Sequence, residues 1–201
     1  MIISSKNIFV YKTTANIILN GGIAIIPTDT VYGFAVNAFN LKSQKQVYII
    51  KKRHYGKPLI LMTYNIRMAE IFVNISATAL KLATKFWPGQ LTLILPTTKL
   101  GKILSGGRDN LGLRIPNNSF ILTLLKEIKV PIFTTSVNIS NEQSAKCISE
   151  VLKFRKYVDV IIDGGKCKFS NESTIIDAVH FPYIIVRKGC LPVTNILNCI
   201  S

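Results

Sequence analysis

Residues 48–62 of the chain read YIIKKRHYGKPLILM. The first residues complete a run with apolar side chains at helical spacing, Leu41–Ile50, for which Asn40 or Ser43 would be the N-cap. The last residues, Leu59–Met62, form a short apolar run typical of a buried strand. The loop between them is rich in lysine and arginine and contains no acid. A helix, a cationic loop and a strand in succession indicate alternating helices and strands.

The same alternation continues on both sides of this segment. Further strands are predicted at Ile23–Pro27, Leu91–Leu95, Leu111–Pro116, Pro131–Ser136, Val158–Gly165, Ser173–Val179 and Tyr183–Gly189. Further helices are predicted at Ile66–Phe72, Ala77–Trp87, Ser119–Ile128 with Ser119 as its cap, Ile148–Lys156, and after Pro192. We therefore expect an α/β sheet domain, and the length of 201 residues is typical of a single domain spanning residues 1–201.

The composition limits the class of protein, its cellular compartment and the kind of partner that it can bind. Apolar residues make up 48% of the chain, which indicates a globular protein. The net charge of +15 favours an anionic partner such as a nucleotide or nucleic acid. The four cysteines include no C-x-x-C pair, so we expect reduced thiols rather than a zinc site. No apolar run reaches the length of a membrane span or a signal peptide, and we expect a cytoplasmic protein without a membrane partner.

Several predicted strands end in hydroxyl, amide or cationic side chains. In open sheets, ligands bind where such loops converge beyond the strand ends. Each group alone is also typical of an ordinary turn, but together they favour an anion site. The groups are Thr28–Thr30, Arg114, Thr134–Asn138, Ser173–Thr174 and Arg187.

Several kinds of chemistry have little support. The two histidines, His54 and His180, lie near no serine or cysteine with a nucleophile signature, so a hydrolase triad is not indicated. Neither a P-loop nor a G-x-G-x-x-G motif is present. The cysteines and histidines do not have the spacing of metal ligands, and we predict no metal held by the protein itself. The remaining lysine, arginine, serine, threonine and asparagine side chains suit phosphate binding and charge neutralisation.

Taken in order, the motifs resemble those of the YrdC/TsaC family, the threonylcarbamoyl-adenylate synthases. Each motif alone is weak, but the ordered set is specific and extends from about Gly22 to Gly189. The matching motifs are PTDTVYG (27–33), KKRHYGKPL (51–59), WPGQLTLIL (87–95), LRIP (113–116), TTSVNIS (134–140), STIID (173–177) and VRKG (186–189).

The resemblance implies a twisted open mixed sheet, flanked by helices, with a concave and positively charged cavity. It implies a nucleotidyltransferase of tRNA modification. In that reaction, L-threonine, bicarbonate and ATP, accompanied by Mg²⁺, give threonylcarbamoyl-AMP and pyrophosphate. Separate transferase proteins then pass the threonylcarbamoyl group to the adenosine beside the anticodon of tRNAs that read codons starting with A. The chain resembles the short bacterial form, and its basic surface leaves open a direct contact with tRNA.

The resemblance also implies roles for individual residues. The K-x-R and S-x-N pairs would form the catalytic tetrad. Residues expected to bind ATP are Lys51, Arg53, Thr134, Ser136, Asn138 and Arg187; those expected to bind threonine are Thr30, Arg114, Ser173 and Thr174. Because the carbamate and the triphosphate are both anionic, fixed cations would offset their repulsion. In an extended loop, Lys51 and Arg53 would point to one side and Lys52 to the other.

Two alternatives belong to other functional classes. A non-catalytic RNA-binding module would explain the basic charge, but not the hydroxyl and amide groups at the strand ends, and no stacking platform is evident. The carbamoylating YrdC-like domain of hydrogenase-maturation proteins would share the motifs. Those proteins carry additional acylphosphatase and zinc-finger domains, and this chain has no C-x-x-C pair.

Overall fold

The computed structural model describes residues 1–169 and 171–200, and within them ten strands form one mixed sheet. The strand order is β1-β8-β2-β3-β7-β4-β6-β5-β9-β10. The neighbouring pairs β1/β8, β2/β8, β4/β6 and β5/β9 are parallel, and the other neighbouring pairs of the described sheet are antiparallel. The strands are β1 (Ile2–Ser4), β2 (Ala24–Ile26), β3 (Gly33–Asn37), β4 (Ile60–Met62), β5 (Leu91–Pro96), β6 (Asn110–Arg114), β7 (Ile132–Ser136), β8 (Val160–Asp163), β9 (Thr174–Asp177) and β10 (Ile184–Arg187).

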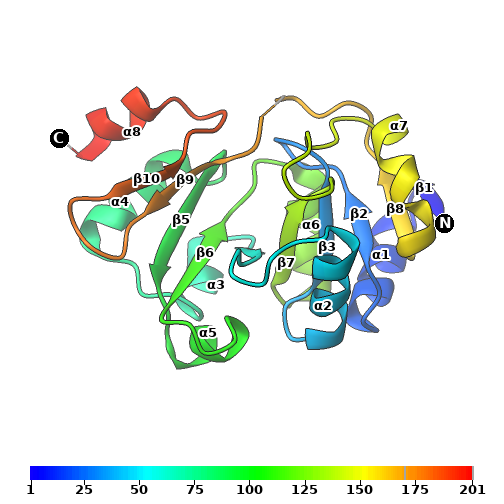
Figure 1. Ribbon diagram of the computed structural model, residues 1–201, viewed down its shortest axis with the longest axis horizontal. Coiled ribbons are helices and arrows are strands. Elements are labelled where there is room, and N and C mark those ends of the chain that lie inside the picture. The colour runs from blue at the N-terminus through cyan, green and yellow to red at the C-terminus, as the bar shows by residue number, and fades with distance from the viewer. Residues whose placement is uncertain (170, 201) are drawn as a thin grey trace.

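Helices pack around this sheet, as Figure 1 shows, so the predicted α/β class with a mixed open sheet is confirmed. They are α1 (Val10–Leu19), α2 (Leu41–Ile50), α3 (Ile66–Glu70), α4 (Ala77–Phe86), α5 (Lys99–Leu104), α6 (Ser119–Ile128), α7 (Ile148–Val151), a 3₁₀ helix (Leu152–Tyr157) and α8 (Val193–Ile200). None of these described helices has the length and apolar character that a bilayer span requires.

Figure 1 shows two lobes joined by the continuous sheet. In one lobe, β5, β6, β9 and β10 lie with α3, α4, α5 and α8. In the other, β1, β2, β3, β7 and β8 lie with α1, α2, α6 and α7. The order of the strands in the sheet differs from their order along the chain, so residues from distant parts of the chain meet in the space between the lobes.

Strand alternation separates the core from this space. Along β5, the side chains of Leu91, Leu93 and Leu95 are fully buried in the core. Thr92 and Ile94 point to the opposite face and line a cavity. Because side chains alternate along a strand, the apolar residues that fold the sheet also fix which residues the cavity receives.

The predicted helix ends were partly correct. Asn40 is the N-cap of α2, and its side chain accepts a hydrogen bond from Ser43 N at 2.9 Å, so of the two candidates Asn40 is the cap. The prediction that Ser119 caps α6 is wrong: Asn118 Oδ1 accepts from Ile121 N at 3.1 Å, and Ser119 is already helical. Both caps are asparagines with extended backbone, which leaves the side chain free to reach the first turn.

Other elements differ in extent or were not predicted. The helix predicted over Ile148–Lys156 is a short α-helix continued by a 3₁₀ helix. Strands β1 and β3 and helices α1 and α5 had no counterpart among the predicted elements. Strand β3, Gly33–Asn37, lacks the alternating pattern because both of its faces are covered, and four of its five residues are buried.

Candidate active site

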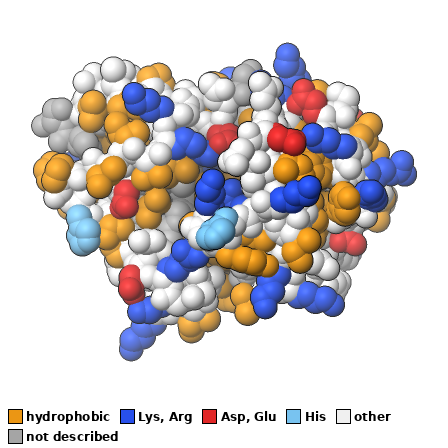
Figure 2. Space-filling model, in the orientation of Figure 1, with side chains coloured by type: hydrophobic (Ala, Val, Ile, Leu, Met, Phe, Trp, Pro, Cys, Tyr) orange, Lys and Arg blue, Asp and Glu red, His pale blue; other side chains and the backbone are white. Residues whose placement is uncertain are grey.

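A cavity of about 660 Å³ opens between the two lobes. Figure 2 shows this face hollowed near its middle, with lysine and arginine side chains beside the hollow. The lining comes from both lobes, including the cationic residues Lys51, Arg53, Lys57, Arg114 and Arg187 and the acidic residues Glu142 and Glu172. The volume falls in the range of pockets that bind small molecules and cofactors.

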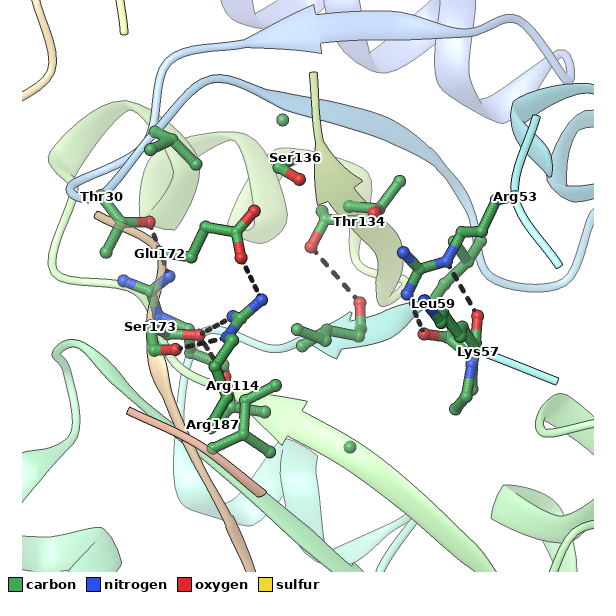
Figure 3. Close-up of a pocket in the computed structure, with 18 of the residues that line it drawn as sticks. Thr30, Arg53, Lys57, Leu59, Arg114, Thr134, Ser136, Glu172, Ser173 and Arg187 are labelled. Carbon is green, nitrogen blue, oxygen red and sulfur yellow. Dashed lines mark hydrogen bonds and ion pairs between the residues drawn. The ribbon is translucent and has the colours of Figure 1, made fainter. Parts of the chain in front are cut away.

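Of the ten site residues predicted from the sequence, the cavity lining includes nine: Thr30, Lys51, Arg53, Arg114, Thr134, Ser136, Asn138, Ser173 and Arg187. Figure 3 shows Thr30, Arg114 and Ser173 on one side of the cavity and Arg53 and Lys57 on the other. Thr174 is not part of the lining. Its hydroxyl is fully buried, donates to Leu191 O at 2.7 Å and accepts from Gly189 N at 3.0 Å.

Lys51 ties the end of α2 to the S-x-N segment. Its Nζ donates to Ser136 O, to Asn138 O at 2.9 Å and to Asn138 Oδ1 at 2.8 Å. Ser136 Oγ donates to the same Oδ1 at 2.7 Å. The Asn138 amide in turn donates to Ile139 O and Glu142 O, so both ends of this side chain are fixed.

Burial and hydrogen bonding have opposite effects on the protonation of the Lys51 side chain. Only 1% of the residue is exposed. Burial, and then the charge of Arg53, lower the pKa of Lys51 to about 7. The three acceptor oxygens favour the ammonium form, because only that form has three N–H donors. A lysine held this way fixes the end of β7 and itself lines the cavity.

The loop after α2 is not extended, so the prediction about its geometry is wrong. Lys51 is the C-cap of α2 with right-handed helical backbone, and Lys52 follows with a φ of 49°, in the left-handed region. Lys52 is exposed while Lys51 and Arg53 line the cavity, as expected. Lys52 points away from Lys51 and Arg53 because of this turn at the end of the helix, and not because side chains alternate along a strand.

Arg53 is held by the loop that it belongs to. Its Nε donates to Lys57 O at 2.9 Å and its Nη2 to Pro58 O at 3.1 Å. An arginine side chain has five N–H groups, so these two bonds fix the guanidinium and leave other donors for a ligand. The dashed lines in Figure 3 show this arrangement at one edge of the cavity.

The opposite side of the cavity contains a buried ion pair that the sequence did not reveal. Arg114 Nη2 lies 2.6 Å from Asp29 Oδ1, and both side chains are only 3% exposed. Arg114 also donates from Nε to Gly89 O at 2.8 Å and from Nη1 to Thr30 Oγ1 at 3.0 Å. Gln90 Nε2 donates to the second oxygen of Asp29. Asp29 thus fixes the direction in which Arg114 presents its remaining N–H groups.

A second ion pair joins Arg187 to Glu172. Arg187 Nη1 contacts Glu172 Oε2, while Nε and Nη2 donate to Ser173 O and Ser173 Oγ. Ser144 Oγ donates to Glu172 Oε1 at 2.6 Å. Burial alone would raise the pKa of Glu172, but Arg187 and the neighbouring hydroxyls outweigh it and hold the pKa below its ordinary value.

The chain matches the family model Sua5_yciO_yrdC, described as telomere recombination, over residues 16–189. The chain belongs to the Sua5/YciO/YrdC family. A Methanocaldococcus jannaschii relative named "Putative threonylcarbamoyl-AMP synthase" is 40% identical over 183 residues, which are 90% of this chain and 86% of the relative. The Pyrococcus abyssi threonylcarbamoyl-AMP synthase is 34% identical over 94% of this chain, and the match spans 57% of that protein. The structure of P. abyssi Sua5 complexed with L-threonine superposes with a TM-score of 0.94 at 32% identity, covering all of this chain and 61% of that one.

Two residues that line the cavity, Ser140 and Glu172, were not among the predicted site residues. Ser140 Oγ is buried without a hydrogen-bond partner within the described part of the chain, and Ser140 lines the cavity, so this hydroxyl is available to a ligand. Glu172 was also missed, although it directly precedes the S-T motif. Reasoning from cations and hydroxyl groups gave no signal for a carboxylate in an anion site.

Proposed function

We propose that this protein synthesises threonylcarbamoyl-AMP from L-threonine, bicarbonate and ATP and releases pyrophosphate. The observation that carries the proposal is the cavity between the lobes, in a family whose curated members include threonylcarbamoyl-AMP synthases. A structural neighbour over the whole of this chain is described as complexed with L-threonine. This product is the first intermediate in forming threonylcarbamoyladenosine in tRNA, so the chain is a nucleotidyltransferase of tRNA modification.

The reaction has two steps. The ammonium of threonine and bicarbonate give N-carboxythreonine, one water and one proton, with a new C–N bond. A carboxylate oxygen of this carbamate then attacks the α-phosphorus of ATP, and the bond from that phosphorus to the leaving pyrophosphate breaks. Both reactants of the second step are anions, and the leaving group gains charge, so fixed cations lower the barrier by electrostatic stabilisation. No covalent intermediate with the protein is required.

Arg53, at one edge of the cavity, and Arg187, which hydrogen-bonds Ser173 on the opposite side, would bind the phosphates. Both guanidinium groups are held by backbone carbonyls and retain free N–H donors. Lys51 would act mainly by holding Ser136 and Asn138 in place beside the phosphates. The hydroxyl groups of Thr134 and Ser140 would complete the nucleotide site, since both residues line the cavity.

The side of the cavity formed by Arg114, Thr30 and Ser173 would hold threonine. Arg114 has two N–H groups beyond its bonds to Asp29, Thr30 and Gly89, and these would bind the substrate carboxylate. Thr30 and Ser173 would provide hydroxyl groups for the polar side chain. Thr174, which points away from the cavity, would contribute indirectly by anchoring the segment from Gly189 to Leu191 that follows β10.

The remaining expectations concern the setting of the reaction. Mg²⁺ would enter bound to ATP and keep phosphate and water ligands, as this ion prefers. Among the described residues, no group of three or more histidine, cysteine, aspartate or glutamate side chains is placed to hold it. We propose a cytoplasmic enzyme that acts through a single domain over residues 1–201. It would hand its product to separate transferase proteins, and its basic surface would be available for contact with tRNA.

The assay that tests this function is pyrophosphate release, with threonine, bicarbonate or ATP omitted in turn. The proposal requires that each omission abolishes release. Release without threonine would refute the threonylcarbamoyl reading. RNA binding without any release would favour the non-catalytic alternative.

A further inference from the structure

The cationic lining of the cavity would attract the carboxylate of an amino-acid substrate and repel its ammonium group. Threonine enters at neutral pH with a carboxylate and an ammonium group. Its carboxylate meets arginines, but its ammonium would be repelled by the cationic lining formed by Lys51, Arg53, Lys57, Arg114 and Arg187. A cation buried among cations needs a compensating anion. Among the described residues of the lining, the acids are Glu142 and Glu172.

Glu172 lies where the two proposed substrates meet. It directly precedes Ser173, which is proposed to bind threonine, and it contacts Arg187, which is proposed to bind phosphate and is itself hydrogen-bonded to Ser173. Figure 3 shows its carboxylate directed into the cavity between Thr30 and Ser136. The amino nitrogen must occupy this region, because the carbamate that forms on it attacks the α-phosphate.

The carboxylate of Glu172 is ionised and still has room for a donor. Arg187 binds Oε2 and Ser144 binds Oε1, whereas a carboxylate offers about four acceptor positions. Its side chain is 28% exposed, so a ligand in the cavity can reach it. Glu142, in contrast, is paired with Lys153 at 3.5 Å, and its side chain is 52% exposed, where solvent screens its charge.

We propose that Glu172 binds the ammonium group of the amino-acid substrate and makes the cavity selective for an α-amino acid. This inference rests on the proposed function, of which it names one specificity-determining contact. The contact between Glu172 and the ammonium group lasts only until the carbamate forms. When the amino group becomes a carbamate it loses its positive charge, so its attraction to Glu172 ends, and Arg187 remains beside the new anion.

The test uses Glu172→Gln, which keeps the shape and an oxygen acceptor but removes the charge. Glu142→Gln is the matched control, because it removes the other acidic charge of the lining. Calorimetry would measure the Kd of L-threonine and of ATP for both variants and for the wild type. The same titration with 2,3-dihydroxybutanoate, in which a hydroxyl replaces the amine, would measure selectivity for the amino group.

We expect Glu172→Gln to weaken threonine binding by about tenfold to a hundredfold, the usual effect of one charge-assisted hydrogen bond. ATP binding should be unchanged or tighter, because a negative charge near the phosphates is gone. The preference for threonine over the hydroxy acid should fall by a similar factor, and Glu142→Gln should match the wild type.

Equal loss of threonine and ATP binding in Glu172→Gln would mean that the residue only maintains the structure, and would overturn the inference. Wild-type threonine affinity in this variant would overturn it as well. If the wild type itself binds no threonine, the proposed function fails instead, so the two failures are distinguishable.

Discussion

Replacing Lys51 with methionine tests whether this residue positions the S-x-N segment. The change keeps an unbranched side chain of similar length but removes three hydrogen bonds, to Ser136 O, Asn138 O and Asn138 Oδ1. At about 1 kcal/mol for each bond, the loss of stability has an upper value of about 3 kcal/mol. The variant no longer buries a charge, which offsets part of that loss. We therefore expect a loss of about 1–2 kcal/mol, or about 2–8 °C in Tm.

Activity should fall much further than stability. With the S-x-N segment released and one cation gone, kcat/KM for pyrophosphate release should drop by about a hundredfold, the order found when one stabilising donor is removed. The assay is steady-state pyrophosphate release beside thermal denaturation. Lys52→Met is the matched control, because Lys52 is the adjacent lysine but is exposed. Wild-type turnover in Lys51→Met, or an equal loss in Lys52→Met, would refute the role assigned to Lys51.

Three further outcomes follow from the same geometry. Asp29→Asn leaves the Arg114 guanidinium buried without its counter-ion, so thermal or urea unfolding should show a loss of about 3–5 kcal/mol; an unchanged Tm would mean that the pair is not buried as described. Because the pKa of Lys51 is lowered from 10.5 to about 7, the unfolded chain binds more protons above pH 7, and stability relative to Lys51→Met should rise with pH across this interval. A flat difference would show that the pKa is not lowered. Arg53→Gln should weaken ATP binding by about tenfold, measured by calorimetry, with a Tm near that of the wild type, since among the described residues this side chain hydrogen-bonds only to its own loop; unchanged ATP affinity would remove Arg53 from the phosphate site.

The sequence was informative where a residue and its spacing determine the outcome locally. Leu41–Ile50 forms α2 with the predicted bounds, because the Asn40 cap and the apolar spacing act within one helix. Strand ends carrying hydroxyl or cationic groups predicted most of the cavity lining, since those strands belong to one sheet and end beside the same cavity. Thr174 was the exception: alternation along β9 turns its side chain away from the cavity.

What the sequence could not reveal depends on contacts between distant segments. Asp29 and Arg114 are 85 positions apart, and only the folded sheet brings them together. Glu172 was overlooked because a carboxylate opposes the positive charge that the motifs suggested, and its importance follows only from Arg187 and Ser144 beside it. The turn at Lys52 likewise depends on how α2 ends, which residue spacing alone does not specify.

The most direct test of the central claim is the composition of the adenylated product. The purified protein would be incubated with ATP, L-threonine and ¹³C-bicarbonate, and the products separated and weighed by mass spectrometry. The proposed reaction gives one AMP adduct that contains both threonine and the labelled carbon, formed together with pyrophosphate. An AMP adduct that lacks threonine, or no adduct at all under conditions in which the protein binds ATP, would contradict it.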